Sequence, residues 1–206
     1  AELRSIFAKV PEQFAVVTNV AEYRAARASG RHAAFIGIQG GNALDFSPDA
    51  LDRIPSGLVL RVTVVHLSSS SLGATSSPLA GRRDTGLTAR GRDFVRALNS
   101  RKIFVDLAHV SRRGFWGNLD DDQLRAVADT GGTIGVMYQS SFLGDSLWNG
   151  RAASIVRHLS HIVKTVGDDH AALGSDWDGA IWPPRDLPTC LELPKLVQLM
   201  LDHDMS

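Results

Sequence analysis

Polar side chains follow five short apolar runs of the sequence, and most of them can titrate or bind a metal. They are Gln39, His66, the pair Asp106 and His109, the pair Tyr138 and Gln139, and the pair Asp176 and Asp178. Imidazole and carboxylate groups are suited to zinc and to the activation of water. Covalent catalysis has less support, because Cys190, the single cysteine, has no base nearby in the sequence and no Gly-x-Ser-x-Gly motif occurs. The pattern favours metal-assisted hydrolysis.

Each of these residues also has an ordinary structural explanation. A single histidine after a strand, such as His66, is more often structural, and Asp176 stands among glycines where an Asx turn is common. Asp106 precedes His109 by three positions and could either orient it or share its site. Trp177 and Trp182 could line a pocket, although aromatic residues near a barrel rim usually cover the core. We expect structural roles for the remaining histidines, His32, His158, His161, His170 and His203.

The elements that must position these residues alternate between strand and helix. Val, Ile and Phe are frequent in the apolar runs, which mostly lack alternation, as in a parallel sheet covered on both faces. The predicted strands are 33–38, 60–65, 103–108, 133–138 and 171–176. The predicted helices are about 20–29, about 48–54, 88–99, 120–130, 152–166 and 193–202. Repeated βα order predicts right-handed crossovers, and in a (β/α) barrel all strands end at one mouth, where active sites lie.

Turn-forming residues are frequent just after two of the predicted strands. Residues 67–86, LSSSSLGATSSPLAGRRDTG, are either a linker or a long βα loop of the kind that carries active sites. In AAFIGIQGGNALD (33–45), two glycines after Gln39 permit a sharp turn that brings residue 39 close to the mouth. We find no internal repeat and no domain boundary, so the sequence predicts one domain over 1–206.

Composition excludes several classes of partner. Twenty-two basic residues balance 22 acidic ones, which gives no electrostatic reason to expect nucleic acid or an anionic membrane. No stretch approaches the roughly 20 apolar residues of a membrane span. The first residues, AELRSIFAKV, lack the order of a signal peptide. No anchor is visible, and a cytoplasmic location is favoured.

Several stretches, in this order along the chain, resemble the membrane dipeptidase (renal dipeptidase) family of zinc metallopeptidases. They are FIGIQGGNALD, RVTVVHLSSSSLG, GLTARGRDFVRALNS, IFVDLAHVSRRGFW, NLDDDQLRAVADTGGTIGVMY, HLSHIVKTVGDDHAALGSDWDG and LPKLVQLMLD. DLAHVS and GSDWDG are the most specific. The resemblance implies a (β/α) TIM-like barrel of the metal-dependent amidohydrolase type, two zinc ions, hydrolysis of dipeptides and a possible homodimer.

The resemblance also implies roles for single residues. His109 aligns with a zinc ligand, and His66 with the histidine that contacts substrate and stabilises the tetrahedral intermediate. Asp176 aligns with the catalytic aspartate near the attacking water. Gln39 stands where the family has the glutamate that bridges two metals, and it remains a candidate metal ligand. The candidate substrate-binding residues are His66, Asn42, Tyr138 and Asp178.

The chain departs from the family pattern in three ways. The His-x-Asp ligand pair of the first strand has no counterpart, and the βα segment expected after Trp116, with a second zinc histidine, is absent. The neutral Gln39 bridges two cations poorly. We therefore expect one zinc ion at most, bound weakly through His109 with Asp176 or Gln39. The alternative function is a non-catalytic relative that binds a small peptide or amino-acid derivative at the barrel mouth.

Overall fold

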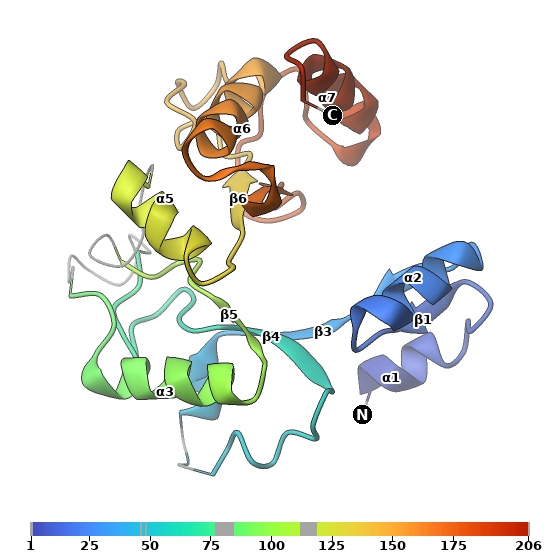
Figure 1. Ribbon diagram of the computed structural model, residues 1–206, viewed down its shortest axis with the longest axis vertical. Helices are drawn as coiled ribbons and strands as arrows, with labels where there is room; N and C mark the ends of the chain where they lie inside the picture. The colour runs from blue at the N-terminus through green and yellow to red at the C-terminus, as the bar shows by residue number, and fades with distance from the viewer. Residues whose placement is uncertain (1, 46, 48, 77–84, 112–118, 206) are drawn as a thin grey trace. The chain divides into compact units, whose positions relative to one another are not determined.

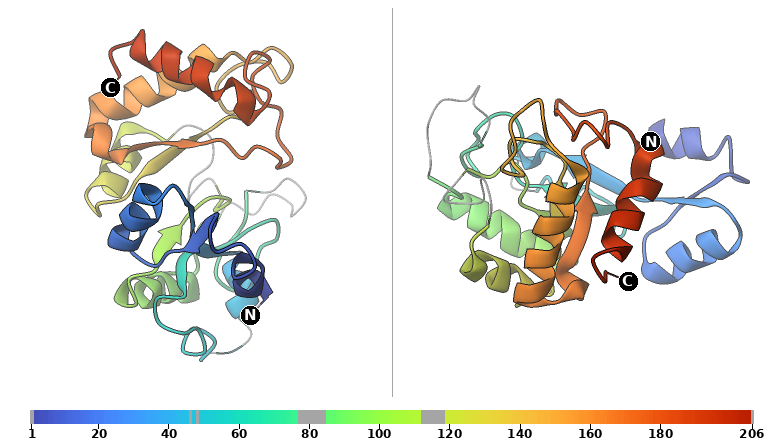
Figure 2. Two further views of the ribbon diagram at one scale, coloured as in Figure 1. Left: turned by 90° about the vertical axis from the view of Figure 1, so that its right-hand side faces the viewer. Right: turned by 90° about the horizontal axis from the view of Figure 1, so that it is seen from above.

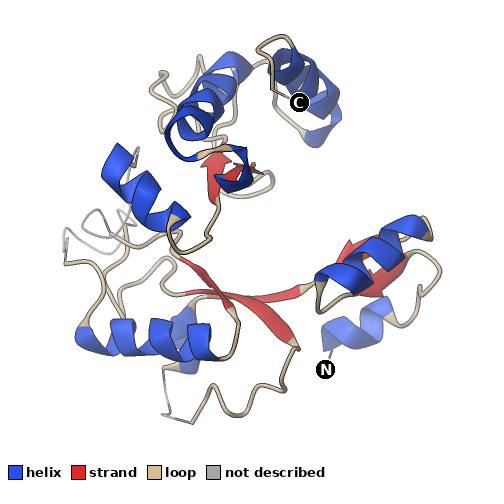
Figure 3. Ribbon diagram, in the orientation of Figure 1, coloured by secondary structure: helices blue, strands red, loops and turns tan. Residues whose placement is uncertain are grey.

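The computed structural model describes residues 2–45, 47, 49–76, 85–111 and 119–205. The chain divides into two compact units, Ala1–Trp116 and Gly117–Ser206. Within the described residues, the strands form three sheets, and the strand pairs of these sheets are parallel. Figure 3 shows the mixture of short strands and longer helices. The prediction of a mixed α/β chain with parallel strands is confirmed.

The first unit begins with a small parallel sheet and two helices. Asn19 caps the second helix, since its side chain accepts a hydrogen bond of 2.9 Å from the Glu22 amide. The two strands pair in parallel, with Phe14 opposite His32. The elements are α1 (Glu2–Phe7), β1 (Phe14–Val16), α2 (Val20–Ala28) and β2 (His32–Ala34).

A three-stranded sheet in the order β3-β4-β5 follows in the same unit. One of its faces packs against α3, where Ile38, Val62 and Val105 contact the cluster that contains Leu98. Figure 1 shows α3 along this sheet. The elements are β3 (Ile36–Gln39), η1 (Gly41–Leu44), β4 (Val59–Thr63), α3 (Ala89–Ser100) and β5 (Phe104–Asp106).

The opposite face of this sheet carries the polar residues. The register places Gly37, Arg61 and Phe104 in one row of cross-strand neighbours. Because side chains alternate along a strand, the next row on this face consists of Gln39, Thr63 and Asp106, at the carboxyl ends of the strands.

The second unit packs three helices around one core. Helix α6 lies against both α5 and α7, as Figures 1 and 2 show. Its residues Ile155, Leu159 and Ile162 are buried, and they join Leu124 and Leu196 in one hydrophobic cluster. The elements are α5 (Asp121–Ala128), β6 (Ile134–Met137), α6 (Ala152–Val166), η3 (Asp168–His170), β7 (Ala171–Gly174), η4 (Cys190–Glu192) and α7 (Leu193–Leu201).

The structure matches most predicted elements, corrects two and adds two. The expected strand 33–38 is two strands, β2 and β3, separated at Phe35 and belonging to different sheets. The expected helix at about 48–54 is a series of turns at its described residues, and α1 and β1 were not predicted. The missing first strand and the missing βα unit stay predictions, as does the single domain.

Among the described residues, no helix combines the length and apolar character needed to cross a lipid bilayer.

Candidate active site

The corner after β3 brings Gln39 into contact with His66. Gly40 has a φ of 104°, a conformation that favours glycine, and its amide donates a hydrogen bond of 3.2 Å to the Thr63 carbonyl. The chain therefore turns sharply at the strand end. The Gln39 Nε2 and His66 Nε2 atoms lie 3.0 Å apart, at hydrogen-bond distance. Asn42 lies at the same corner, because a Cβ atom at Gly40 would come within 2.7 Å of the Asn42 Oδ1.

His109 joins this pair from the turn after β5. Its φ is 67°, in the left-handed region that histidine enters more readily than most residues. Its ring meets that of His66 edge to face, with centroids 4.7 Å apart and an interplanar angle of 90°. Three polar side chains from the ends of three neighbouring strands thus meet in one place.

The serine-rich segment after β4 is a βα loop that holds both histidines, at least over its described residues 67–76. The Thr75 hydroxyl donates a hydrogen bond to the His66 carbonyl. The Ser76 amide donates another, of 2.8 Å, to the His109 carbonyl. This loop therefore ties the two backbone positions together, and the linker interpretation of residues 67–76 is wrong. Residues 77–84 of the segment lie outside the described part of the chain.

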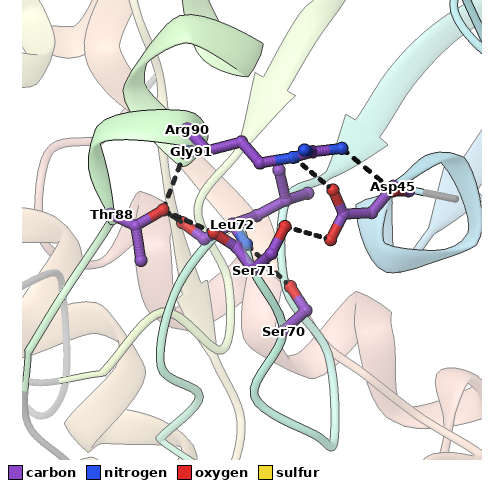
Figure 4. A network of polar contacts seen from close by, with 7 residues as sticks. All are labelled: Asp45, Ser70, Ser71, Leu72, Thr88, Arg90 and Gly91. Carbon is purple, nitrogen blue, oxygen red and sulfur yellow. Dashed lines mark hydrogen bonds and ion pairs between the residues drawn. The ribbon is translucent and has the colours of Figure 1, made fainter. Parts of the chain in front are cut away.

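A network of hydrogen bonds and ion pairs joins the same loop to Asp45 and to the start of α3, as Figure 4 shows. Asp45, which follows η1, accepts hydrogen bonds from Ser71 and, at 2.7 Å, from the Arg90 Nε. The Arg90 guanidinium also donates to the Asp45 carbonyl at 3.0 Å. Thr88 caps α3 and donates its hydroxyl proton to the Ser71 carbonyl. The segment that carries Gln39 and the segment that carries His66 are thereby fixed to the start of α3.

This network was not among the predicted site residues. Its members are far apart in the sequence, and the only local signal was the position of serines directly after a strand, where α/β proteins place functional loops.

The remaining predicted residues belong to the second unit. Asp176 and Asp178 are exposed and follow β7, with φ values of 57° and 65°. The Gly179 amide donates a hydrogen bond of 3.0 Å to the Asp176 carbonyl. A Cβ atom at Gly179 would lie 2.8 Å from the Asp176 Oδ2, so this glycine leaves room for the carboxylate.

Tyr138 follows β6 and is buried, with 1% of its surface exposed. Its ring packs edge to face on Trp177, at a centroid distance of 5.1 Å. Removal from water disfavours the phenolate and raises the pKa of Tyr138 to about 12. Its burial and its contact with Trp177 suit a role in packing at the end of β6. Contact with substrate stays a prediction for Tyr138, Asp178 and Asn42.

Gln139, which lies shortly after β6, holds the loop after β7 in place. Its Oε1 accepts a hydrogen bond of 2.6 Å from the Trp182 amide, and the Trp182 carbonyl accepts one of 2.9 Å from Ser140. The exposed Trp182 ring meets Trp148 edge to face at 5.7 Å. Trp182 therefore lies at the surface, whereas Trp177 packs against the core cluster.

The histidines expected to be structural have neighbours that suit such roles. His158 and His170 each contact a backbone carbonyl, at 3.2 and 2.7 Å, and His161 pairs with Asp121 at 2.9 Å. Likewise, His203 contacts the Leu199 carbonyl, and the His32 ring packs against that of Phe14 in a tilted arrangement.

The corner of the first unit offers two imidazoles and a neutral amide oxygen, which are possible metal donors. These three side chains include no carboxylate that could bridge two cations. Among the described residues, no group of three or more His, Cys, Asp or Glu side chains is arranged to hold a metal.

A parallel α/β chain with imidazoles gathered at its strand ends matches a known family of hydrolases. The family model described as Membrane dipeptidase (Peptidase family M19) matches residues 2–117 and 116–206, and the chain belongs to this family. The resemblance seen in the sequence is thereby confirmed. The two matches meet where the two units divide, at Trp116 and Gly117.

Particular relatives agree with this assignment. An uncharacterised Klebsiella pneumoniae protein encoded in the pqqA 5′ region is 34% identical in an alignment of 149 residues, and the match covers 58% of this chain and 55% of that protein. An uncharacterised dipeptidase of Schizosaccharomyces pombe is 29% identical in a gapped alignment of 206 positions, and the match covers 86% of this chain and 49% of that protein. The chain thus spans about half the length of the curated relatives it matches.

A solved structure shares the fold. The metallopeptidase of Rhodobacter sphaeroides, liganded with a phosphinate mimic of the dipeptide L-Ala-D-Ala, superposes with a TM-score of 0.81 at 26% identity. The match covers 98% of this chain and 66% of that one.

Proposed function

We propose that this chain is part of a metal-dependent dipeptidase, and that its parallel strands belong to a (β/α) barrel of the amidohydrolase type. The observation that supports this function is the contact of Gln39 with His66, and of His66 with His109, at the ends of three neighbouring strands. Because the chain belongs to the dipeptidase family, we assign this cluster to peptide-bond hydrolysis.

The proposed roles follow from the chemistry of each side chain. A bound zinc ion would activate a water molecule and polarise the scissile carbonyl. His109, with Gln39, would hold the ion. His66 would donate a hydrogen bond to the oxyanion, which develops negative charge in the transition state. Asp176 would accept the proton of the attacking water and deliver it to the leaving amine.

Gln39 favours a second candidate function. Its amide keeps one oxygen donor but lacks the negative charge that holds two cations together, so this chain would bind one zinc ion weakly or none. A relative without turnover could still use the Gln39, Asn42 and His66 corner to bind a small peptide or amino-acid derivative.

Metal removal separates the two candidates. The chain is dialysed against a chelator, and hydrolysis of L-Ala-D-Ala, L-Ala-L-Ala and Gly-L-Phe is followed before and after zinc is restored. Activity that disappears with the metal and returns with it supports the dipeptidase. Saturable binding of these dipeptides by calorimetry, with no hydrolysis at any zinc concentration, supports the non-catalytic relative. Light scattering of the same samples tests the predicted homodimer.

The substitution Gln39→Glu tests the role of the missing charge. At 4 Å, two unit charges in water attract by about 1 kcal/mol, and the doubly charged ion doubles this. We therefore expect the zinc dissociation constant to fall by at least about tenfold in a calorimetric titration.

The matched control is Gln123→Glu, which makes the same chemical change in the capping box of α5. Equal zinc affinity in wild type and Gln39→Glu, or an equal gain in the control, would contradict the placement of the metal at Gln39.

A further inference from the structure

Asp106 lies at the end of β5, on the sheet face opposite to the one that packs against α3. Its Oδ2 accepts a hydrogen bond of 2.9 Å from the Thr63 hydroxyl and forms an ion pair with the Arg61 Nη1 at 3.2 Å. Its Oδ1 accepts a hydrogen bond of 2.9 Å from the Ala108 amide. Only 19% of the side chain is exposed. Both oxygens are therefore occupied by protein donors, which leaves Asp106 poorly suited to bind substrate directly.

These bonds set the path of the chain into His109. The Ala108 bond closes the first part of the turn after β5, and His109 follows at once with its left-handed φ of 67°. The Thr63 hydrogen bond and the Arg61 ion pair anchor the same carboxylate to the neighbouring strand β4. The turn is thus fixed at its start by Asp106 and at its end by the Ser76 bond to the His109 carbonyl.

We propose that Asp106 is a positioning residue that aims the His109 imidazole at His66. The conformational part of this proposal stands on the geometry alone, and only its consequence for metal binding rests on the proposed function. Of the two possibilities raised by the Asp-x-x-His spacing, orientation and a shared site, the contacts favour orientation.

The site requires an acceptor at both oxygens of residue 106. An asparagine has nearly the same shape but one oxygen and one amide nitrogen. In one orientation its NH₂ group faces the Ala108 N–H, so a donor meets a donor and the turn must shift. In the other orientation the Thr63 hydroxyl can turn to accept, but the NH₂ group faces the Arg61 guanidinium, which has no acceptor. Removal of the charge also leaves the Arg61 guanidinium without its partner.

The test uses the imidazole signals of the whole chain in the absence of metal. Long-range ¹H–¹⁵N spectra of the seven histidines are recorded, and the His66 and His109 signals are assigned with His66→Asn and His109→Asn. We expect Asp106→Asn to move both signals and to leave that of His32 unchanged. The matched control is Asp93→Asn on α3, where an exposed aspartate pairs with Arg96.

A second variant keeps the test decisive if Asp106→Asn does not fold. Thr63→Val has nearly the same volume at a buried position and deletes one donor to Asp106. It should move the same two signals by a smaller amount. The proposal is overturned if neither Thr63→Val nor folded Asp106→Asn moves the His66 and His109 signals further than the control Asp93→Asn does.

A zinc titration of the same samples examines the consequence for the metal. Loss of an outer-shell partner typically weakens metal binding 10- to 100-fold, and we expect the zinc dissociation constant of Asp106→Asn to rise by about tenfold. A wild-type chain that binds no zinc would count against the proposed function, whereas the imidazole spectra would still decide the role of Asp106.

Discussion

The substitution Gly91→Ala should destabilise the first unit although it places alanine in a helix. Gly91 lies in the first turn of α3, and a Cβ atom there would come within 1.8 Å of the Leu72 carbonyl oxygen and 2.8 Å of its carbon. Both atoms belong to the backbone of the loop that begins at His66, so no side-chain rotation relieves the contact. The helix or the loop must move.

The magnitude follows from opposing effects. In an unobstructed helix, alanine is favoured over glycine by about 1 kcal/mol. Overpacking of a tight contact costs about 1–3 kcal/mol and occasionally more. Displacement also strains the bond of 3.0 Å that the Thr88 amide donates to the Leu72 carbonyl, and a hydrogen bond contributes about 1 kcal/mol. We expect a net loss of about 2 kcal/mol in the free energy of unfolding.

Urea denaturation followed by far-ultraviolet circular dichroism measures this loss, and hydrogen exchange shows where it falls. Exchange should accelerate over residues 66–76 and 89–100, the two segments that the contact joins. The control is Gly135→Ala in β6, where the added Cβ meets its nearest atom at an ordinary 3.5 Å. A Gly91→Ala chain as stable as wild type, or more stable, would refute the close approach of α3 to Leu72.

Two further predictions concern the second unit. Because burial raises the pKa of Tyr138 from its usual 10.0 to about 12, the unfolded phenol ionises first as the pH rises. The contribution of Tyr138 to the free energy of unfolding should therefore be fully present below pH 10 and fall by about 2 kcal/mol toward pH 12. Urea titrations of Tyr138→Phe should lack this decline. Asp120→Ala removes the side chain that caps α5 through a bond of 2.9 Å to the Gln123 amide. It should lower the melting temperature through a loss of about 1 kcal/mol; unchanged melting would show that this cap is not needed.

The sequence predicts elements best where local signals agree. Helix 152–166 is predicted to the residue, because its apolar face repeats at helical spacing and Gly167 ends it with a φ of 95°. The run 33–38 reads as one strand because apolar character does not reveal which neighbour each half pairs with. β2 pairs with β1, and β3 pairs with β4, so long-range partners decide the break.

The candidate site follows the same rule. The ends of neighbouring parallel strands meet at one edge of a sheet, so the gathering of Gln39, His66 and His109 could be predicted from their positions alone. The brace formed by Asp45, Ser71 and Arg90 could not, because its partners are 26 and 45 residues apart and lie on loops and a helix terminus. Such contacts depend on how segments pack, which no local pattern encodes.

The left-handed residues at the strand ends have a consequence for how this site can change over evolutionary time. His109, Asp176 and Asp178 are three of the five non-glycine residues with positive φ in the described part of the chain. Each costs conformational energy that glycine would not incur. Selection for stability alone would therefore tend to erase these side chains, whereas Asp and His are among the types that tolerate the conformation best. At these positions the conformational cost opposes the chemical roles that the proposed function gives to His109 and Asp176.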